Sequence, residues 1–209
     1  MDGELLRAVF LVGGAYLVGS VPTGVLMARL TGGRDPRTVG SGRTGGTNAF
    51  RAMGAARGLA VGLLDVGKGA VPVLVARWLG ASEFLQALVG VAAVVGSWRS
   101  VFLGFHGGRG VASGIGAMLA IAPLVVIISG PVFLGVIALS RYVSLGSLLG
   151  SAAAAATMLA LVAFGVIEPV WLVFGISAAI IVWLAHADNI DRLLHGRERK
   201  FSFNDRERG

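Results

Sequence analysis

The stretch from Gly104 to Ser113 combines residue types that can bind an anion. It reads Gly-Phe-His-Gly-Gly-Arg-Gly-Val-Ala-Ser and lies between two apolar runs. Glycines lack a Cβ atom, so successive backbone N–H groups can turn toward a phosphate, and a helix beginning near Val111 would add the partial positive charge of its N-terminus. Arg109 supplies a fixed cation. The stretch predicts a phosphate cradle, and the competing interpretation is a tight turn with an interfacial anchor.

A second polar segment, Arg34 to Arg51, is much richer in Gly, Ser, Thr and Asn than a connection needs for membrane orientation. Its backbone donors and hydroxyl groups could bind a phosphate or a carbonyl oxygen, while Arg43 and Arg51 neutralise charge. The alternative is a flexible basic loop that contacts anionic lipid.

Two charged residues, Asp65 and Lys68, interrupt an apolar run. Because they lie three positions apart, they share one face of a helix. Charges in a membrane-spanning helix are costly unless they are paired or face a polar interior. A structural ion pair is the simpler interpretation, and a transport pathway is the functional one.

Polar residues at two further places could join this chemistry. Ser144 and Ser147 share a face after Arg141, although serines in membrane helices usually bond to their own backbone. His186 and Asn189 would share a helix face where the last apolar run meets water. A histidine there could exchange protons near neutral pH or donate to phosphate, or it could be an interfacial residue without chemistry.

The composition places these residues in a membrane protein. Of 209 residues, 55% are hydrophobic and 14% are charged, whereas an ordinary soluble domain is about 25% charged. The apolar runs are continuous rather than alternating, which favours helices over a β-barrel, and the 33 glycines suit helices that pack closely in lipid. The apolar runs are Ala8 to Ala28, Leu59 to Ala76, Phe84 to Gly96, Val111 to Leu139, Val143 to Ile167 and Val170 to Ala185.

The run from Val111 to Leu139 exceeds the roughly 20 residues that a bilayer requires. Pro123 and the sequence Ser129-Gly130-Pro131 interrupt it, so it could be one tilted span or a hairpin of two short ones. The positive-inside rule favours two crossings, because the basic tail after His186 then lies on the same side as the arginine-rich first connection.

We therefore predict an all-α polytopic membrane protein with seven transmembrane helices, its N-terminus outside and its C-terminus cytoplasmic. Residues 1–209 would form a single integral membrane domain, with a short basic cytoplasmic tail at about 187–209. Every polar segment described above would then lie on the cytoplasmic face.

The charge and the residue counts also exclude several classes. The formal charge of +7 could suggest nucleic acid, but the basic residues lie between apolar runs, where membrane orientation explains them. The chain has no Cys, which excludes a thiolate nucleophile and disulfides, and its three His are scattered without metal-site spacing. We expect no metal, no cofactor and no nucleic-acid partner.

Five motifs in this order resemble the bacterial acyl-phosphate:glycerol-3-phosphate acyltransferase family, commonly called PlsY. They span nearly the whole chain, and together they are far more specific than any one alone. The motifs are Gly19 to Gly24, Gly40 to Asn48, Phe105 to Ser113, Arg141 to Leu145 and His186 to Leu194.

The resemblance implies transfer of a fatty acyl group from acyl phosphate to the 1-hydroxyl group of glycerol 3-phosphate. Lysophosphatidate and phosphate would be the products, in bacterial phospholipid synthesis at the plasma (inner) membrane. The partners would be the two substrates and the lipid bilayer. By motif, the catalytic residues implied are Ser41, Arg109, Ser144, His186 and Asn189. The substrate-binding residues implied are Gly42, Thr47, Asn48, Arg51, Gly107, Gly108, Gly110 and Glu198.

The chain departs from the family pattern at several positions. Arg109 stands where the family has Lys, which retains the charge and changes the donor geometry. His106 replaces the first Lys of Lys-Gly-Gly-Lys, Arg43 replaces the Asn of Gly-Ser-Gly-Asn, and Ser97 replaces the His of a usual Gly-His pair. The resemblance thus describes a divergent member, and the alternative function is a non-catalytic or transport-like relative that binds a phosphorylated lipid or solute.

Overall fold

The computed structural model describes residues 2–202, and this part of the chain is helical and contains no β-strand. The prediction of an all-α protein is confirmed. The α-helices are α1 (Asp2–Ser20), α2 (Thr23–Thr31), α3 (Gly46–Met53), α4 (Ala55–Trp78), α5 (Glu83–Trp98), α6 (Val111–Ile121), α7 (Pro123–Ser140), α8 (Val143–Ala163), α9 (Leu172–Ala185) and α10 (Ala187–Leu194).

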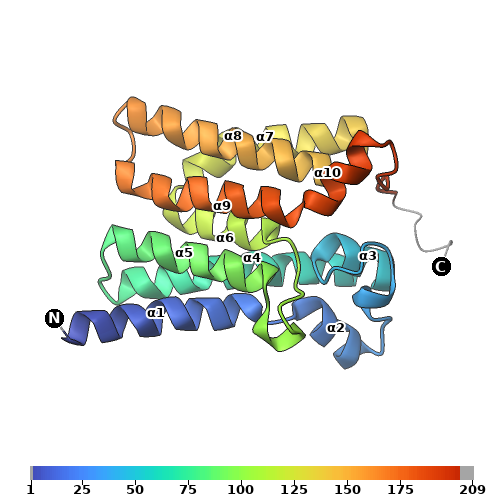
Figure 1. Cartoon of the computed structure of the whole chain (residues 1–209), viewed down its shortest axis with the longest axis horizontal. Helices are drawn as coiled ribbons and strands as arrows, with labels where there is room; N and C mark the ends of the chain where they lie inside the picture. Colours follow the sequence, from blue (N-terminus) through green and yellow to red (C-terminus); the bar gives the residue numbers. More distant parts are fainter. Residues whose placement is uncertain (1, 203–209) are drawn as a thin grey trace.

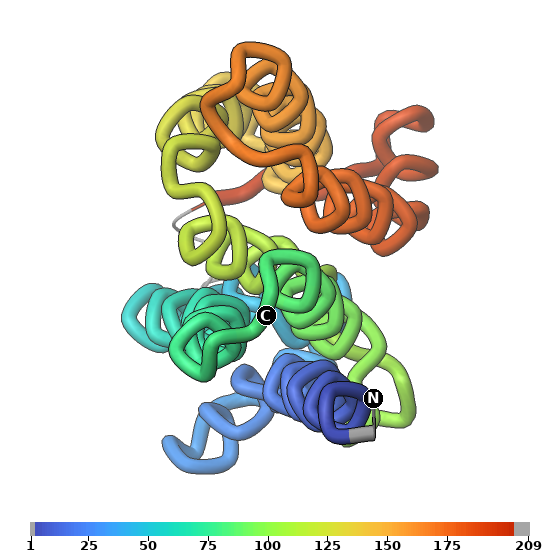
Figure 2. Tube along the Cα trace, turned by 90° about the vertical axis from the view of Figure 1, so that its left-hand side faces the viewer, coloured from blue at the N-terminus to red at the C-terminus, as the bar shows by residue number. Residues whose placement is uncertain are grey.

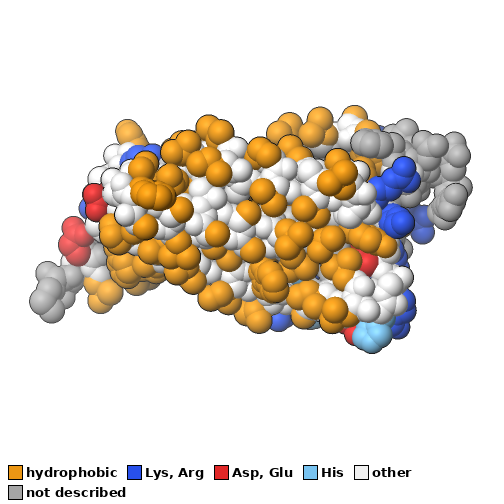
Figure 3. All heavy atoms as spheres, turned by 90° about the horizontal axis from the view of Figure 1, so that it is seen from above, with side chains coloured by type: hydrophobic (Ala, Val, Ile, Leu, Met, Phe, Trp, Pro, Cys, Tyr) orange, Lys and Arg blue, Asp and Glu red, His pale blue; other side chains and the backbone are white. Residues whose placement is uncertain are grey.

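Several of these helices suit a lipid bilayer. Within residues 2–202, five are long and apolar enough to cross a membrane, namely those at Gly3–Ser20, Ala55–Trp78, Glu83–Leu103, Pro123–Ser140 and Val143–Ala163. A sixth results if the bent pair Pro169–Ala185 and Ala187–Leu194 is one span, whereas α6 is shorter. Hydrophobic side chains cover the middle of the face in Figure 3, and Lys and Arg lie mainly at the end that carries α10. These are the features of a multi-pass membrane protein.

The first apolar run does not form one helix, contrary to the predicted span from Ala8 to Ala28. It breaks between α1 and α2, at Val21 and Pro22. Proline has no N–H group to donate, and its ring disfavours a helical conformation at the residue before it. In the break, the carbonyl oxygen of Val21 accepts the N–H of Thr23 at 3.0 Å and a second hydrogen bond from Lys68 of α4.

The run from Val111 to Leu139 forms two helices, α6 and α7, which meet at Ala122 directly before Pro123. The expected interruption at Ser129-Gly130-Pro131 is absent, because Pro131 lies inside α7. Since α6 packs chiefly against α4 and α7 packs chiefly against α8, the two helices belong to different parts of the bundle.

Two glycines allow α4 and α6 to approach closely. A Cβ atom on Gly69 would overlap the carbonyl oxygen of Ser113, and one on Gly116 would overlap that of Val66. Close backbone approach through small residues is a common way for helices to pack in lipid. It holds the start of α6 against α4, and both helices line the pocket described below.

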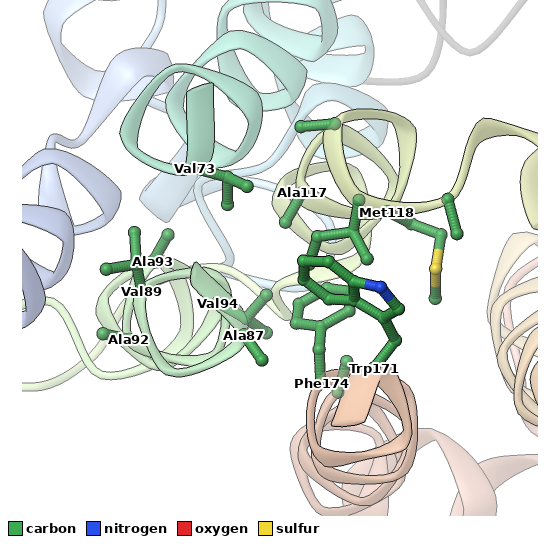
Figure 4. Close-up of a cluster of buried hydrophobic side chains, with 14 of the residues drawn as sticks. Val73, Ala87, Val89, Ala92, Ala93, Val94, Ala117, Met118, Trp171 and Phe174 are labelled. Carbon is green, nitrogen blue, oxygen red and sulfur yellow. The ribbon is translucent and has the colours of Figure 1, made fainter. Parts of the chain in front are cut away.

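The main hydrophobic core lies where α4, α5, α6 and α9 meet (Figure 4). Phe174 of α9 and Trp171, in the turn before it, point between α5 and α6, and Phe174 is fully buried. Val73 of α4 and Val94 of α5 are also fully buried. The core thus joins the N-terminal helices to the C-terminal group.

The bundle has two groups of helices, seen end-on in Figure 2: α1, α4, α5 and α6 on one side, and α7, α8 and α9 on the other. Contacts of α9 with α5 and α6 connect the groups. The short helices α3 and α10 lie at the same end of the bundle, opposite the N-terminus (Figure 1). That end therefore gathers polar segments that are far apart in the sequence.

Candidate functional site

A pocket of about 840 Å³ lies at this end of the bundle. The segment around α3, one face of α4, the starts of α6 and α8, part of α7, α10 and the residues after α10 all contribute to its walls. Part of its lining is apolar and includes Leu59, Ile115, Phe133, Leu134 and Ile137. Another part is polar and carries several cations, so the pocket can hold a molecule with an anionic head and an apolar chain.

Most of the site residues predicted from the sequence meet in this pocket. The predicted catalytic residues that line it are Ser41, Arg109, Ser144, His186 and Asn189. The predicted binding residues that line it are Thr47, Asn48, Arg51, Gly108, Gly110 and Glu198. The other two predicted binding residues, Gly42 and Gly107, are not among the described residues that line the pocket. The fold thus brings most of the predicted site residues together in one pocket. The role of each residue remains a prediction.

The buried side chain of Asn48 organises the loop before α3. The two N–H groups of its amide nitrogen are shared among three carbonyl oxygens, those of Pro36 at 2.6 Å, Val39 at 3.1 Å and Arg43 at 2.8 Å. Its oxygen accepts the backbone N–H of Ser41 at 3.2 Å. The amide of Asn48 is thus engaged by its own loop, including the backbone of Ser41.

The glycine-rich stretch differs from the predicted phosphate cradle in the partners of its N–H groups. The backbone N–H of Gly107 donates to the carbonyl of Trp98 at 3.0 Å, and that of Gly108 donates to the carbonyl of Ser97 at 2.8 Å. These two donors are therefore not available to an anion. Gly110 adopts a left-handed conformation with φ of 76° directly before α6. Anion binding here would depend on the first turn of α6 and on Arg109.

Arg109 is held beside a carboxylate of α10. Its Nη2 donates to Oδ2 of Asp188 at 2.9 Å, and Arg192 donates to the same oxygen at 3.2 Å. The Arg109 side chain is only 15% exposed. Burial lowers the pKa of its guanidinium, the charge of Asp188 opposes this effect, and an arginine remains charged in either case. The pocket therefore contains a fixed and largely desolvated cation.

Glu198, which follows α10, connects three polar side chains. Its Oε1 accepts the hydroxyl of Ser144 at 2.8 Å and the amide of Asn189 at 2.7 Å, and its Oε2 accepts Nε of Arg192 at 2.8 Å. Burial raises the pKa of Glu198, but the hydrogen bonds from Arg192, Ser144 and Asn189 outweigh it, so the net pKa is lowered. An ionised Glu198 thus orients Ser144 and Asn189 rather than exchanging protons.

His186 lies in the bend between α9 and α10 and is 2% exposed. Burial lowers its pKa from 6.5 to about 4, against the opposing effect of its hydrogen bond to the Val182 carbonyl. Because a carbonyl only accepts, the Nδ1 that lies 2.8 Å from Val182 carries the proton. The ring is neutral near pH 7, and its Nε2 can accept a hydrogen bond from a hydroxyl group. The expected donation to phosphate is therefore disfavoured at this nitrogen.

Two buried atoms of the pocket lack hydrogen-bond partners within residues 2–202: Nε of Arg109 and Oδ1 of Asn189. A buried polar atom without a partner costs about 1–3 kcal/mol. Because both atoms are closed off from solvent, a ligand with an anionic oxygen and a hydroxyl group can pair with them only after the two side chains shift. In the same part of the chain, no group of three or more His, Asp or Glu is placed to hold a metal ion.

The family model for glycerol-3-phosphate acyltransferase matches residues 9–196, most of the chain. The chain belongs to the glycerol-3-phosphate acyltransferase family. Among its curated relatives, the glycerol-3-phosphate acyltransferase of Geobacter sulfurreducens is 44% identical over 197 residues, which covers 94% of this chain and 99% of the relative. That of a Thermus thermophilus strain is 45% identical over 187 residues, covering 89% of this chain and 91% of the relative.

Solved structures of glycerol-3-phosphate acyltransferases have the same fold. One is the glycerol 3-phosphate form of PlsY (YgiH), an integral membrane glycerol 3-phosphate acyltransferase, with a TM-score of 0.85 and 40% identity over 94% of this chain and 96% of that chain. The lysophosphatidic acid form matches with a TM-score of 0.82 and 36% identity, and the match covers 95% of this chain and 97% of that chain. The resemblance and the acyltransferase assignment are confirmed, and the transport-like alternative is not favoured.

Sequence reasoning about this acyltransferase site did not assign roles to Asp188 and Arg192, although both lie in the last motif. Their spacing of four residues is the signal for an ion pair on one helix face. What the sequence could not reveal is that Asp188 also contacts Arg109, which lies 79 residues before it.

Proposed function

We propose that this protein transfers a fatty acyl group from an acyl phosphate to the 1-hydroxyl group of glycerol 3-phosphate, giving lysophosphatidate and inorganic phosphate in bacterial phospholipid synthesis. The observation that carries the proposal is a single pocket that joins a buried cation, Arg109, to an apolar part of the lining. A fatty acyl phosphate has this combination of anion and chain. The names of the family and of its solved structures support the choice of acceptor.

The reaction requires positioning and charge neutralisation more than covalent catalysis. Acyl phosphate is a mixed anhydride with a good leaving group. The oxygen of the glycerol hydroxyl attacks the acyl carbon and forms the ester bond, while the bond from that carbon to the phosphate oxygen breaks. The electron pair leaves with the phosphate, and the hydroxyl proton passes to a phosphate oxygen. Holding the reactants in line and stabilising the developing charge account for such a step.

Within this scheme, the guanidinium group of Arg109 neutralises phosphate charge and binds a phosphate oxygen. Oδ1 of Asn189 and Nε2 of His186 accept hydrogen bonds from glycerol hydroxyl groups. Ser41 donates to a phosphate or carbonyl oxygen at the same site. Ser144, whose proton goes to Glu198, offers its hydroxyl oxygen to a glycerol hydroxyl group.

The substrate-binding segments complete the scheme around these side chains. Thr47, Arg51 and Gly110 contact the phosphates, while Asn48, Glu198, Gly42, Gly107 and Gly108 maintain the shape of the loops. The support for this division is the set of hydrogen bonds that already engages Asn48 and Glu198.

We also infer the orientation in the membrane. Residues 1–209 would form a single domain that crosses the plasma membrane seven times, with the N-terminus outside and both the tail and the pocket on the cytoplasmic side. The distribution of Lys and Arg supports this arrangement, as does the separation of α6 from α7 at Ala122. Both substrates would then reach the pocket from the cytoplasm.

The proposed reaction is tested by measuring phosphate release from palmitoyl phosphate by the purified protein in detergent, with and without glycerol 3-phosphate. The proposal expects release that depends on glycerol 3-phosphate and is matched by lysophosphatidate. A parallel reaction with palmitoyl-CoA identifies the donor, since activity with palmitoyl-CoA alone would overturn the acyl-phosphate assignment.

A further inference from the structure

Asp65 and Lys68 of α4 form a buried ion pair that the scheme above does not use. Nζ of Lys68 lies 2.9 Å from Oδ1 of Asp65, and the two side chains are 10% and 7% exposed. The same Nζ donates to the carbonyl oxygen of Val21 at 3.1 Å, in the break between α1 and α2. Thr23, the first residue of α2, donates its hydroxyl to Oδ1 of Asp65 at 2.5 Å.

The pair lies at the polar end of the pocket. Asp65 and Lys68 both line it. A Cβ atom on Gly45, the residue that caps the N-terminus of α3, would lie 4.0 Å from Oδ2 of Asp65. A Cβ atom on Gly108 would lie 3.9 Å from the nitrogen of Gly45. The pair therefore adjoins the start of α3, which in turn lies beside Gly108 of the glycine-rich stretch.

One of the three N–H donors of the Lys68 ammonium group has no acceptor in the described part of the chain. A lysine carries three N–H donors, and in the described part of the chain two acceptors, on Asp65 and Val21, are present. A buried ion pair contributes little net stability, because removing both charges from water costs about as much as their attraction returns. Stability alone thus gives no reason to keep Lys68 charged beside the pocket, whereas an anionic ligand does.

We propose that Lys68 binds a substrate phosphate group with its third N–H, at the end of the pocket where α3 begins. Asp65 and the Val21 carbonyl hold the ammonium in place, and Thr23 holds Asp65. The partial positive charge at the start of α3 adds to the attraction of the same anion. This inference rests on the proposed function and deepens it. The reaction brings two phosphate groups into one pocket, and Lys68 supplies a cation separate from the Arg109, Asp188 and Arg192 cluster.

The direct test compares the KM values of wild-type protein and Lys68→Met for each substrate in turn. Loss of one charge-assisted hydrogen bond should raise the KM for one substrate about 10- to 100-fold. The substrate whose KM rises identifies the phosphate, either that of glycerol 3-phosphate or that of the acyl donor. Lys68→Arg should recover part of the loss, because the charge is restored.

Two control variants separate phosphate binding from a general disturbance of the helices. Thr23→Val removes the hydrogen bond to the same carboxylate and leaves the ammonium in place, so it should change KM much less than Lys68→Met. Arg77→Met removes an equal charge from the far end of α4, where Arg77 donates to Gln86, and should leave both KM values unchanged. If Lys68→Met does not fold, Lys68→Gln takes its place.

The inference is wrong if Lys68→Met leaves both KM values within about twofold of wild type, or if Thr23→Val raises the same KM equally. If the wild-type protein shows no turnover, the proposed function fails, and binding of inorganic phosphate still tests Lys68. Calorimetry on the detergent-solubilised wild type and Lys68→Met should show affinity at least about tenfold lower in the variant. Equal affinities would overturn the role of Lys68.

Discussion

The carboxylate of Glu198 accepts a hydrogen bond of 2.8 Å from the hydroxyl of Ser144, although 54 residues separate the two positions. The same oxygen accepts the amide of Asn189 at 2.7 Å. The segment after α10 therefore connects back to the start of α8. Two side chains expected to contact substrate derive their orientation from a residue that lies outside the helices.

Replacing Glu198 by Gln should disturb both side chains at once. The variant loses the ion pair with Arg192. It also replaces the carboxylate that accepts hydrogen bonds from Ser144 and Asn189 by an uncharged amide. We expect kcat/KM to fall about 10- to 100-fold, since a charge-assisted hydrogen bond is worth about 1.5–3 kcal/mol. Glu168→Gln, at an exposed position between α8 and α9, is the matched control. Equal activities of the two variants would contradict the role of Glu198.

Replacing Asn48 by Ala should loosen the loop before α3. Four hydrogen bonds to this loop disappear, and the buried carbonyls lose their partner. We expect the free energy of unfolding to fall by about 1–3 kcal/mol and the KM for phosphate-bearing substrates to rise. Thermal unfolding and initial rates measure the two effects. Thr38→Val, which removes an exposed hydrogen bond in the same loop, should change neither. Lost activity without lost stability would instead favour direct substrate binding by Asn48.

Replacing Gly116 by Ala should separate α4 from α6. The added methyl group would overlap the carbonyl oxygen of Val66, and such overpacking typically costs about 1–3 kcal/mol. The melting temperature should fall, and activity should fall with it because both helices line the pocket. Gly135→Ala in α7, where a Cβ atom meets no atom within 4 Å, provides the comparison. A fully stable Gly116→Ala protein would show that the close packing is not required.

The buried His186 predicts a loss of stability in acid. Its pKa is lowered from 6.5 to about 4, mainly by burial, so the unfolded chain binds a proton at a higher pH than the folded protein does. Folding should therefore lose stability as the pH falls from about 6.5 toward 4, by about 3 kcal/mol at the lower limit. Above pH 6 the ring is neutral in the folded state, and its titration should not shape the rate between pH 6 and 8.

Thermal unfolding measured at pH 7 and pH 4 checks this expectation. His186→Gln should lose less stability over that range than the wild type does. His195→Gln removes an exposed imidazole that is 60% accessible and should behave as the wild type. If the wild type and His186→Gln lost the same stability between pH 7 and pH 4, a lowered pKa of His186 would be contradicted.

The helical class and much of the site were predictable because each is indicated by residues that lie close together in the sequence. Continuous apolar runs define membrane helices, and Arg109, Ser144 and His186 each lie in a short motif of distinctive residue types. The break at Val21 was missed because the hydropathy of the run continues across it, although Pro22 is a helix breaker. The reverse error occurred at Pro131, which α7 accommodates.

The remaining features depend on contacts between distant segments. The N–H groups of Gly107 and Gly108 were expected to face an anion, but Trp98 and Ser97 return close enough to accept them. Asp188 reaches Arg109 in a structure where α10 bends away from the preceding helical segment by 59°. No pattern within either segment encodes these approaches. They follow from the packing of the whole bundle, which also decides which polar atoms of Arg109 and Asn189 remain without partners.

The most direct test of the central claim is the rate of phosphate release from palmitoyl phosphate, dependent on glycerol 3-phosphate, in wild type, Arg109→Ala and Arg99→Ala. Arg99 lies over the ring of Trp98 and serves as the charge control. The account predicts release matched by lysophosphatidate in wild type and Arg99→Ala, and a loss of at least about 100-fold in Arg109→Ala. Equal release by Arg109→Ala, or no release that depends on glycerol 3-phosphate in the wild type, would contradict it.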